Sequence, residues 1–71
     1  MMDWFETPES SNISRFRYDA ETLTLEIEFK NGNIYQYFDF PEPVYEAFCQ
    51  TGSKGQFFHQ NIRGIYRYAR C

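Results

Sequence analysis

Basic and aromatic side chains gather in the last third of the sequence, in an order that suits contact with a nucleic acid strand. The basic and aromatic residues are Lys54, Arg63, Tyr66, Arg67, Tyr68 and Arg70, and Ser53 and Gly55 on either side of Lys54 complete the set. Guanidinium groups bind phosphates in a fork, and aromatic rings stack on unpaired bases. Tyr35 and Tyr37 join the set as rings that would also stack if they were exposed. This composition is typical of a small protein that binds single-stranded RNA.

The beginning of this set also predicts a helix start. Ser53 and the glutamine three residues later have the spacing of a capping box, so a helix is expected to begin at Lys54. Free backbone N–H groups and the helix dipole favour an anion at such an end. The competing interpretation is structural: Ser53 caps the helix, Gly55 permits a close approach, and Tyr66 and Tyr68 fill the edge of the core.

Catalytic and metal-binding chemistry finds little support. His59 is the single imidazole, and nothing fixes it beside either thiol, Cys49 or Cys71, as a catalytic pair requires. One histidine without a Cys-x-x-Cys pair cannot complete a zinc set. Glu26 and Glu28 have the spacing of any solvated strand face, which does not indicate an acid–base dyad. The sequence therefore predicts a non-enzymatic binding module without a metal ion or cofactor.

Charge is distributed unevenly along the chain. The 71 residues include ten acids, seven Lys or Arg and one His, for a net charge of −3. Residues 1–46 hold all ten acids and three bases and sum to −7, whereas residues 47–71 hold four bases and no acid. The total disfavours nucleic acid as a partner, but phosphates respond to a local basic face. The alternative is that the two halves neutralise one another in the fold.

Composition also bounds the class of protein. Aromatics make up 21% of the chain, which excludes disorder, because disordered chains are poor in aromatics. No apolar run approaches the ~20 residues of a membrane span. The first residues lack the basic and apolar stretches of a signal peptide. With no cysteine-pairing motif, a reduced, cytoplasmic protein without a membrane partner is expected.

Alternating and helical patterns predict the fold. An irregular N-terminal arm (1–12) precedes a single domain (13–71), whose strands are expected at 13–18, 23–29 and 34–40 and whose helices are expected at 43–51 and 54–63. Residues 65–71 are either extended or helical. The order predicts an α+β fold: a three-stranded antiparallel β-meander followed by two short helices packed on one sheet face.

The hairpin turn at Gly32 leaves two registers open. A type I′ turn would place Tyr35 and Tyr37 on the outer face of the sheet. A type I turn with a bulge at Gly32 would place both rings on the inner face with Leu25 and Ile27, because a one-residue slip reverses every side chain. The bulged form is favoured, because tyrosine rings on the outer face would bury less apolar surface than rings on the inner face. Buried rings would belong to the core and would offer no platform to a base.

The N-terminal arm carries two large apolar side chains, Trp4 and Phe5. They are expected to fold back onto the domain, because leaving both in water would be costly. The alternative is an exposed hook for a partner protein. A second functional hypothesis follows: a protein–protein interaction domain that uses this arm or the acidic strand face of Glu26 and Glu28.

Several runs of the sequence resemble the KTSC domain family. The matching positions are Ser10-Ser11-Asn12-Ile13, Tyr18-Asp19, Leu23-x-Leu25-x-Ile27-x-Phe29, Gly32, Tyr35-Gln36-Tyr37, Pro41, Val44-Tyr45 and Ser53-Lys54-Gly55-Gln56-Phe57-Phe58-x-x-x-Ile62-Arg63-x-x-Tyr66-x-Tyr68. The resemblance covers nearly all of the chain. The chain departs from the family by its Trp4-Phe5 arm and its acidic first half.

The resemblance implies a domain of the kind found at the C-terminus of some lysyl-tRNA synthetases and as stand-alone bacterial proteins. No catalytic residues carry over from this family, whose function is not established and for which RNA binding has been suggested. Its marked positions here are Tyr35, Tyr37, Ser53, Gly55, Ile62, Arg63 and Tyr66. The expected partner is therefore RNA, either tRNA or a single strand, or else another protein.

Overall fold

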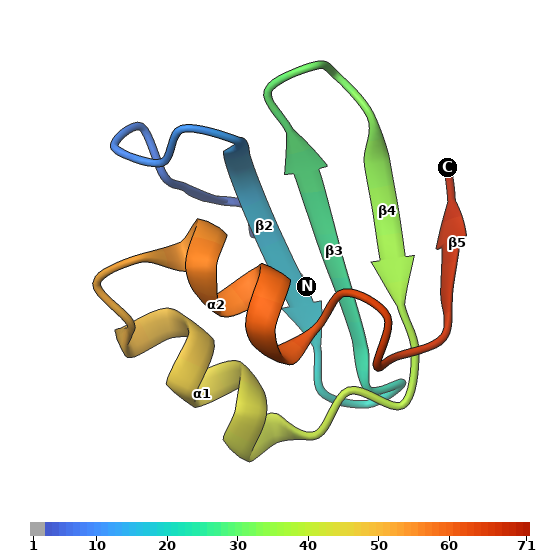
Figure 1. The fold of residues 1–71 in the computed structure, drawn as a ribbon. Helices are drawn as coiled ribbons and strands as arrows, with labels where there is room; N and C mark the ends of the chain where they lie inside the picture. Colours follow the sequence, from blue (N-terminus) through green and yellow to red (C-terminus); the bar gives the residue numbers. More distant parts are fainter. Residues whose placement is uncertain (1–2) are drawn as a thin grey trace.

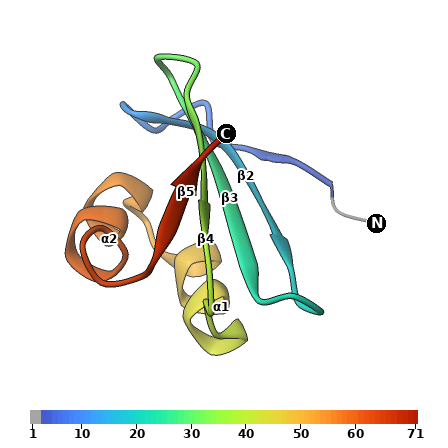
Figure 2. The same ribbon diagram turned by 90° about the vertical axis from the view of Figure 1, so that its right-hand side faces the viewer.

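The computed structural model describes residues 3–71. Its centre is an antiparallel sheet of five strands in the order β1-β2-β3-β4-β5, so strands that follow one another in sequence are neighbours (Figure 1). Both helices lie against the same face of this sheet (Figure 2). The elements are β1 (Phe5–Glu6), β2 (Ile13–Asp19), β3 (Thr24–Phe29), β4 (Ile34–Tyr37), α1 (Glu42–Gln50), α2 (Lys54–Asn61) and β5 (Tyr68–Arg70). The predicted α+β class is confirmed, whereas three strands were too few.

The two additional strands are short and form the edges of the sheet. β1 lies within the arm that was predicted to be irregular, and it pairs Phe5 with Phe16 of β2. β5 pairs with β4, where Ala69 faces Gln36, and so resolves the open choice at the C-terminal end in favour of an extended chain. Strands of two and three residues are too short for an alternating pattern to reveal them.

The turn between β3 and β4 has the bulged form. The N–H of Gly32 donates to the carbonyl oxygen of Phe29 (2.9 Å), and the N–H of Phe29 donates to the carbonyl oxygen of Asn33 (2.8 Å). Gly32 has φ +91°, in the left-handed region that glycine enters without steric cost. Glycine is therefore the residue that takes up this conformation with the least strain.

This turn sets the register of the hairpin. Tyr35 lies opposite Ile27, and Tyr37 lies opposite Leu25. Residues directly opposite in an antiparallel pair share one face, so both tyrosines lie on the helix side with the apolar residues of β3. The bulged register favoured by the sequence is confirmed, and the type I′ alternative is wrong.

The chain breaks from the sheet earlier than predicted, at Tyr37. Asp39 has φ +55°, and this local reversal returns the next side chain, Phe40, to the core, where none of it is exposed. The N–H of Phe40 donates to the carbonyl oxygen of Leu23 (2.9 Å). Leu23 has φ +54° and is 39% exposed, so it does not belong to the strand that was expected at 23–29, and β3 begins one residue later.

The helices begin where proline and serine predict them to begin. α1 follows Pro41 and buries Phe48 against the sheet. At the start of α2, the Ser53 hydroxyl accepts a hydrogen bond from the N–H of Gln56 (3.4 Å), as expected of a cap. α2 ends two residues before the predicted Arg63, so this arginine lies in the turn that follows the helix.

One apolar core joins the helices to the sheet. Its members are Ile13, Phe16, Leu25, Ile27, Tyr37, Phe40, Phe48, Phe58 and Ile62. Aromatic rings dominate this set, which is how a chain too short for a large aliphatic core excludes water. Neither helix is long and apolar enough to cross a membrane within the described residues.

Candidate nucleic-acid interface

A hollow of about 510 Å³ opens between α2 and the strands β3, β4 and β5, and we call it the aromatic hollow. Its apolar walls are the rings of Phe29, Tyr35, Tyr37, Phe58 and Tyr68. Polar groups of Asn12, Asn31, His59 and Arg63 complete the lining together with Gly64. The volume lies within the ~300–1,000 Å³ typical of small-ligand sites. The bulged hairpin creates this hollow, because it brings both tyrosines of β4 to the helix side.

The three tyrosine rings of the aromatic hollow form a graded surface. Tyr68 is 58% exposed, Tyr35 is half-buried and Tyr37 is 4% exposed. The centroid of the Tyr68 ring lies 5.7 Å from that of Tyr35 and 6.0 Å from that of Tyr37. Of the three rings, Tyr68 therefore offers the largest free surface to a ligand. The hypothesis that Tyr37 is a platform for a base is wrong, because this ring belongs to the core.

Burial also controls the chemistry of Tyr37. Loss of solvent, with smaller contributions from Tyr35 and Tyr68, raises the pKa of Tyr37 to about 12. The positive charge of Arg63, which lines the same hollow, acts in the opposite direction on this pKa. The floor of the hollow is thus neutral at physiological pH, and a cation stands beside it.

Arg63 is the exposed cation of the aromatic hollow. It takes no part in an ion pair among residues 3–71. No carboxylate lines the hollow, although the chain carries ten acids. Its charge is therefore available to an anionic ligand.

A second hollow of about 450 Å³ adjoins the first, and we call it the polar hollow. It lies between the loop at residues 9–12 and the start of α2, and it includes Ser53, Lys54 and Gly55. Asn12 and His59 line both hollows and so join them.

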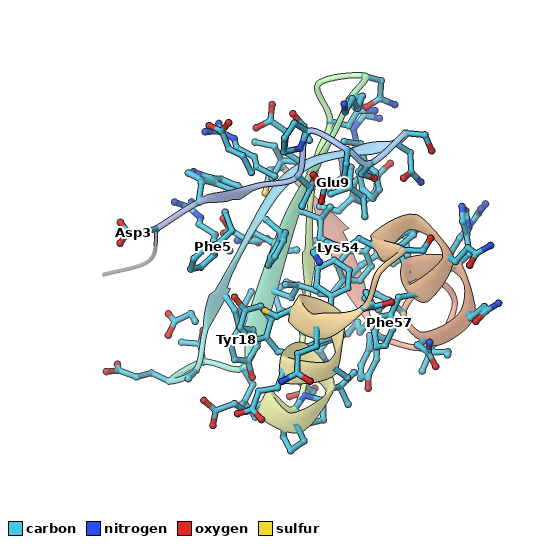
Figure 3. All side chains as sticks on the ribbon, turned by 90° about the vertical axis from the view of Figure 1, so that its left-hand side faces the viewer. Asp3, Phe5, Glu9, Tyr18, Lys54 and Phe57 are labelled. Atoms are coloured by element: carbon cyan, nitrogen blue, oxygen red, sulfur yellow. The ribbon has the colours of Figure 1, made fainter. Side chains whose placement is uncertain are left out.

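Lys54 does not point freely into solvent. Its ammonium group donates to the carbonyl oxygens of Cys49 (3.2 Å) and Thr51 (3.4 Å) at the end of α1. It also lies 5.7 Å from the Phe48 ring centroid. Figure 3 shows Lys54 between the helices and the N-terminal segment that carries Glu9. A cation suits the negative end of a helix dipole, so Lys54 has a structural role in addition to the predicted phosphate contact.

Gly55 allows the N-terminal loop to approach α2. A Cβ atom at this position would lie 2.8 Å from Oδ1 of Asn12. The same oxygen accepts a hydrogen bond from the Ser10 hydroxyl (3.2 Å), which holds the amide in place. The predicted close approach at Gly55 is confirmed. Sequence reasoning placed Asn12 in the irregular arm and in a run that resembles the KTSC family, but it gave Asn12 no role in the site.

Three of the predicted site residues line neither hollow. Arg67 places Nη2 3.7 Å from Oδ2 of Asp39, and Tyr66 packs its ring 4.7 Å from that of Phe40. Arg70 donates from Nη2 to Oδ1 of Asn33 (3.3 Å) at the end of β5. The four predicted bases therefore do not form a single patch. Tyr66 fills the core edge, as the structural alternative proposed.

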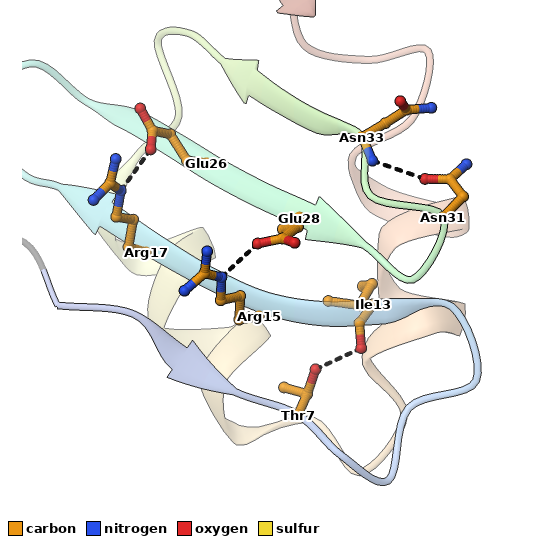
Figure 4. A network of polar contacts seen from close by, with 8 residues as sticks. All are labelled: Thr7, Ile13, Arg15, Arg17, Glu26, Glu28, Asn31 and Asn33. Carbon is orange, nitrogen blue, oxygen red and sulfur yellow. Dashed lines mark hydrogen bonds and ion pairs between the residues drawn. The ribbon is translucent and has the colours of Figure 1, made fainter. Parts of the chain in front are cut away.

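The outer face of the sheet carries a ladder of ion pairs. Nε of Arg15 donates to Glu28 and Nε of Arg17 donates to Glu26, and each donor–acceptor distance is 2.5 Å (Figure 4). The side-chain amide of Gln36 donates to the second carboxylate oxygen of Glu26 (2.7 Å). Glu26 is only 8% exposed. These acids are satisfied within the fold. The acidic strand face is therefore not a set of free carboxylates, because Glu26 and Glu28 are both paired within the sheet.

The N-terminal arm covers part of this ladder. The Trp4 ring centroid lies 4.3 Å from the guanidinium carbons of both Arg15 and Arg17. The Phe5 ring lies 5.9 Å from that of Phe16, although 56% of Phe5 remains exposed. The expectation that Trp4 and Phe5 fold back is confirmed. Trp4 in particular is no free hook.

Within residues 3–71, no three His, Cys, Asp or Glu side chains converge as a metal ion would require.

A family model described as the KTSC domain matches residues 9–68. The chain belongs to the KTSC domain family. This KTSC domain overlays a crystal structure of a KTSC domain protein from Yersinia pestis with a TM-score of 0.91 and 33% identity, covering 100% of this chain and 99% of that one.

Lysine–tRNA ligases are among its relatives. The KTSC domain is 44% identical over 61 residues to the enzyme of Trichormus variabilis and 46% identical to that of a Nostoc species. These matches cover 86% of this chain but only 11% of each ligase. An uncharacterized protein of Stutzerimonas stutzeri is 36% identical, and the match covers 87% of this chain and 89% of that protein.

Proposed function

We propose that this KTSC domain is a small, non-enzymatic module that binds single-stranded RNA through the aromatic hollow. The observation that carries the proposal is the position of Arg63, an exposed cation without an ion-pair partner in residues 3–71, beside three tyrosine rings and no acid. Phosphate binding to a guanidinium and base stacking on tyrosine together supply the two contacts that single-stranded binding requires.

The relatives support the same direction. Lysine–tRNA ligases act on an RNA, and this domain matches a segment amounting to 11% of their length. A segment of this size that also forms most of the Stutzerimonas protein behaves as a separable unit. A unit joined to a tRNA ligase would be well placed to bind the RNA that the enzyme uses.

A salt titration with paired charge reversals tests this proposal. Fluorescence anisotropy would measure binding of a labelled, unstructured RNA and of tRNA as the salt concentration rises. We expect affinity to fall linearly on logarithmic axes. Arg63→Glu should abolish most of the binding and lower the salt slope by at least about 1.

Arg67→Glu is the matched control, because it changes the net charge equally but lies outside both hollows. It should cause a much smaller loss of affinity than Arg63→Glu. Absence of binding at low salt, or equal losses in the two variants, would overturn the proposal.

A further inference from the structure

The aromatic hollow has a closed apolar floor and an exposed ring at its rim, and we call this part of it the slot. Tyr37 and Phe58, which are 4% and 5% exposed, close its floor, whereas Tyr68 stands at its rim with 58% of its surface free. The Phe29 ring centroid lies 5.2 Å from that of Phe58 and 5.6 Å from that of Tyr35. These contacts join α2 to β3 and β4 and hold the walls in place without a ligand.

The charges around this slot select the class of ligand. A cationic ligand is disfavoured, because Arg63 lines the hollow and no carboxylate balances it. The phenol of Tyr37 stays protonated, so it does not repel an anion. A flat ring that carries an anionic group close by fits both features, and a nucleotide is such a ligand.

The rim also offers groups that can meet the edge of a base. Asn12 and Asn31 both line the hollow, and the carboxamide of an asparagine has two N–H donors and an acceptor oxygen. Oδ1 of Asn31 already accepts from the N–H of Asn33 (3.0 Å), which fixes the orientation of this amide. Its two N–H donors remain directed away from that bond.

We propose that the aromatic hollow accepts one unpaired base of the bound RNA, stacked on the exposed ring of Tyr68, with the adjoining phosphate on Arg63. The inference rests on the proposed function and goes beyond it, because it assigns the hollow to a single base and disfavours a duplex. A paired base would first have to leave its stack, which costs free energy, so a duplex should bind more weakly than a single strand.

The experiment uses RNA in which bases are removed while phosphates are kept. A short oligonucleotide made wholly of abasic residues is compared with one that carries a single 2-aminopurine, a fluorescent base that loses intensity on stacking. The full chain is titrated with each, and with a fully paired duplex of the same length. The single base should raise affinity by about 5- to 100-fold over the abasic strand, the range of stacking on one aromatic ring. Its fluorescence should fall on binding.

Variants of the rim test the position of the base. Tyr68→Ala should remove the gain and the fluorescence change, whereas Tyr68→Phe should keep both, because the ring remains. Phe5→Ala is the matched control: it removes another exposed ring from an edge strand, and Phe5 lies outside the hollow. Thermal melting of each variant would show that the fold is retained.

The outcomes separate this inference from the proposed function. If RNA binds with dependence on Arg63 but the abasic strand and the duplex bind as tightly as the single-base strand, the base slot is wrong and RNA binding stands. If Tyr68→Ala and Phe5→Ala give equal effects, the slot is wrong as well. If no RNA binds at low salt, the proposed function fails and this inference fails with it.

Discussion

The two faces of the sheet use the same kinds of side chain for different ends. On the outer face, Arg15 and Arg17 lie directly opposite Glu28 and Glu26 across the β2–β3 pair, and Trp4 covers both guanidinium groups. On the helix side, Arg63 lies near tyrosine rings in a hollow without a carboxylate. On the outer face, arginines beside an aromatic ring are paired with acids and covered by that ring. On the helix side, the arginine beside the rings has no ion-pair partner in residues 3–71.

The difference teaches that pairing decides the role of a charged residue. Register places an acid opposite each arginine of β2, so the charge is neutralised within the sheet. Arg63 lies beyond the end of α2, in a turn where no strand partner faces it. In the acid-rich half of the sequence, Glu26 and Glu28 form ion pairs with Arg17 and Arg15. Arg63 therefore remains as a local unpaired cation within residues 3–71, although the net charge of the chain is −3.

Breaking the ladder should cause the largest loss of stability. Glu26→Ala would leave Arg17 and Gln36 without their carboxylate at a site that is 8% exposed, and we expect a loss of about 3 kcal/mol. Urea unfolding would measure it. Glu28→Ala is the control, because its pair is more exposed and should cost ~1 kcal/mol or less. RNA affinity per folded molecule should not change in either variant, and a specific loss in Glu26→Ala would contradict the separation of the two faces.

Alkaline pH should destabilise the helix side next. The pKa of Tyr37 is raised to about 12, mainly by burial. Below pH ~10 the phenol is protonated in both the folded and the unfolded chain, so stability is at its full value. Between pH ~10 and ~12 only the unfolded chain ionises, and the free energy of unfolding falls by about 1.4 kcal/mol for each step of one in pH. Absorbance at alkaline pH would follow the phenol, and thermal melting would follow the fold. Tyr37→Phe should lose part of this dependence; an unchanged pH profile in that variant would show that another group is responsible.

Removing the cover of the ladder should have a smaller effect. Trp4→Ala loses two cation–π contacts on the partly exposed outer face, worth about 1–2 kcal/mol together. Thermal melting would detect the loss, and proteolysis of the arm would accelerate. The RNA affinity should equal that of the parent chain. A marked drop in affinity would place the binding surface on the outer face and overturn the comparison.

The sequence predicted the parts of the fold that have a long enough pattern. Strict alternation in β3 and the serine at the start of α2 were sufficient to place both elements. β1 was not predicted, and β5 was left open between an extended and a helical segment, because strands of two and three residues depend on pairing with the sheet and show no period of their own. The return of Phe40 to the core depends on one left-handed residue, Asp39, which no periodicity reveals.

The candidate site was harder to predict for a similar reason. Arg63 and Tyr68 were identified from residue type, but the sequence could not show that Arg67 turns toward Asp39 or that Lys54 binds the end of α1. Asn12 lies more than forty residues from Gly55, and only the folded chain brings the two together. The residue types alone thus gave the candidate residues. Which of them share a hollow depends on long-range packing that the sequence does not show.

The smallest expected effect concerns the turn that assigns the tyrosines to their face. Gly32→Ala forces a side chain into φ +91° and should cost about 1 kcal/mol. Gly52→Ala is the matched control, because a Cβ there meets nothing within 4 Å and its backbone lies outside the left-handed region. The register should survive in Gly32→Ala, since a one-residue slip would carry Tyr35 and Tyr37 to the outer face and take Tyr37 out of the core. Cross-strand nuclear Overhauser contacts between Ile27 and Tyr35 would report the register. Their loss would show that core packing alone does not hold the register, and equal destabilisation by both alanines would show that the left-handed backbone at Gly32 carries no strain.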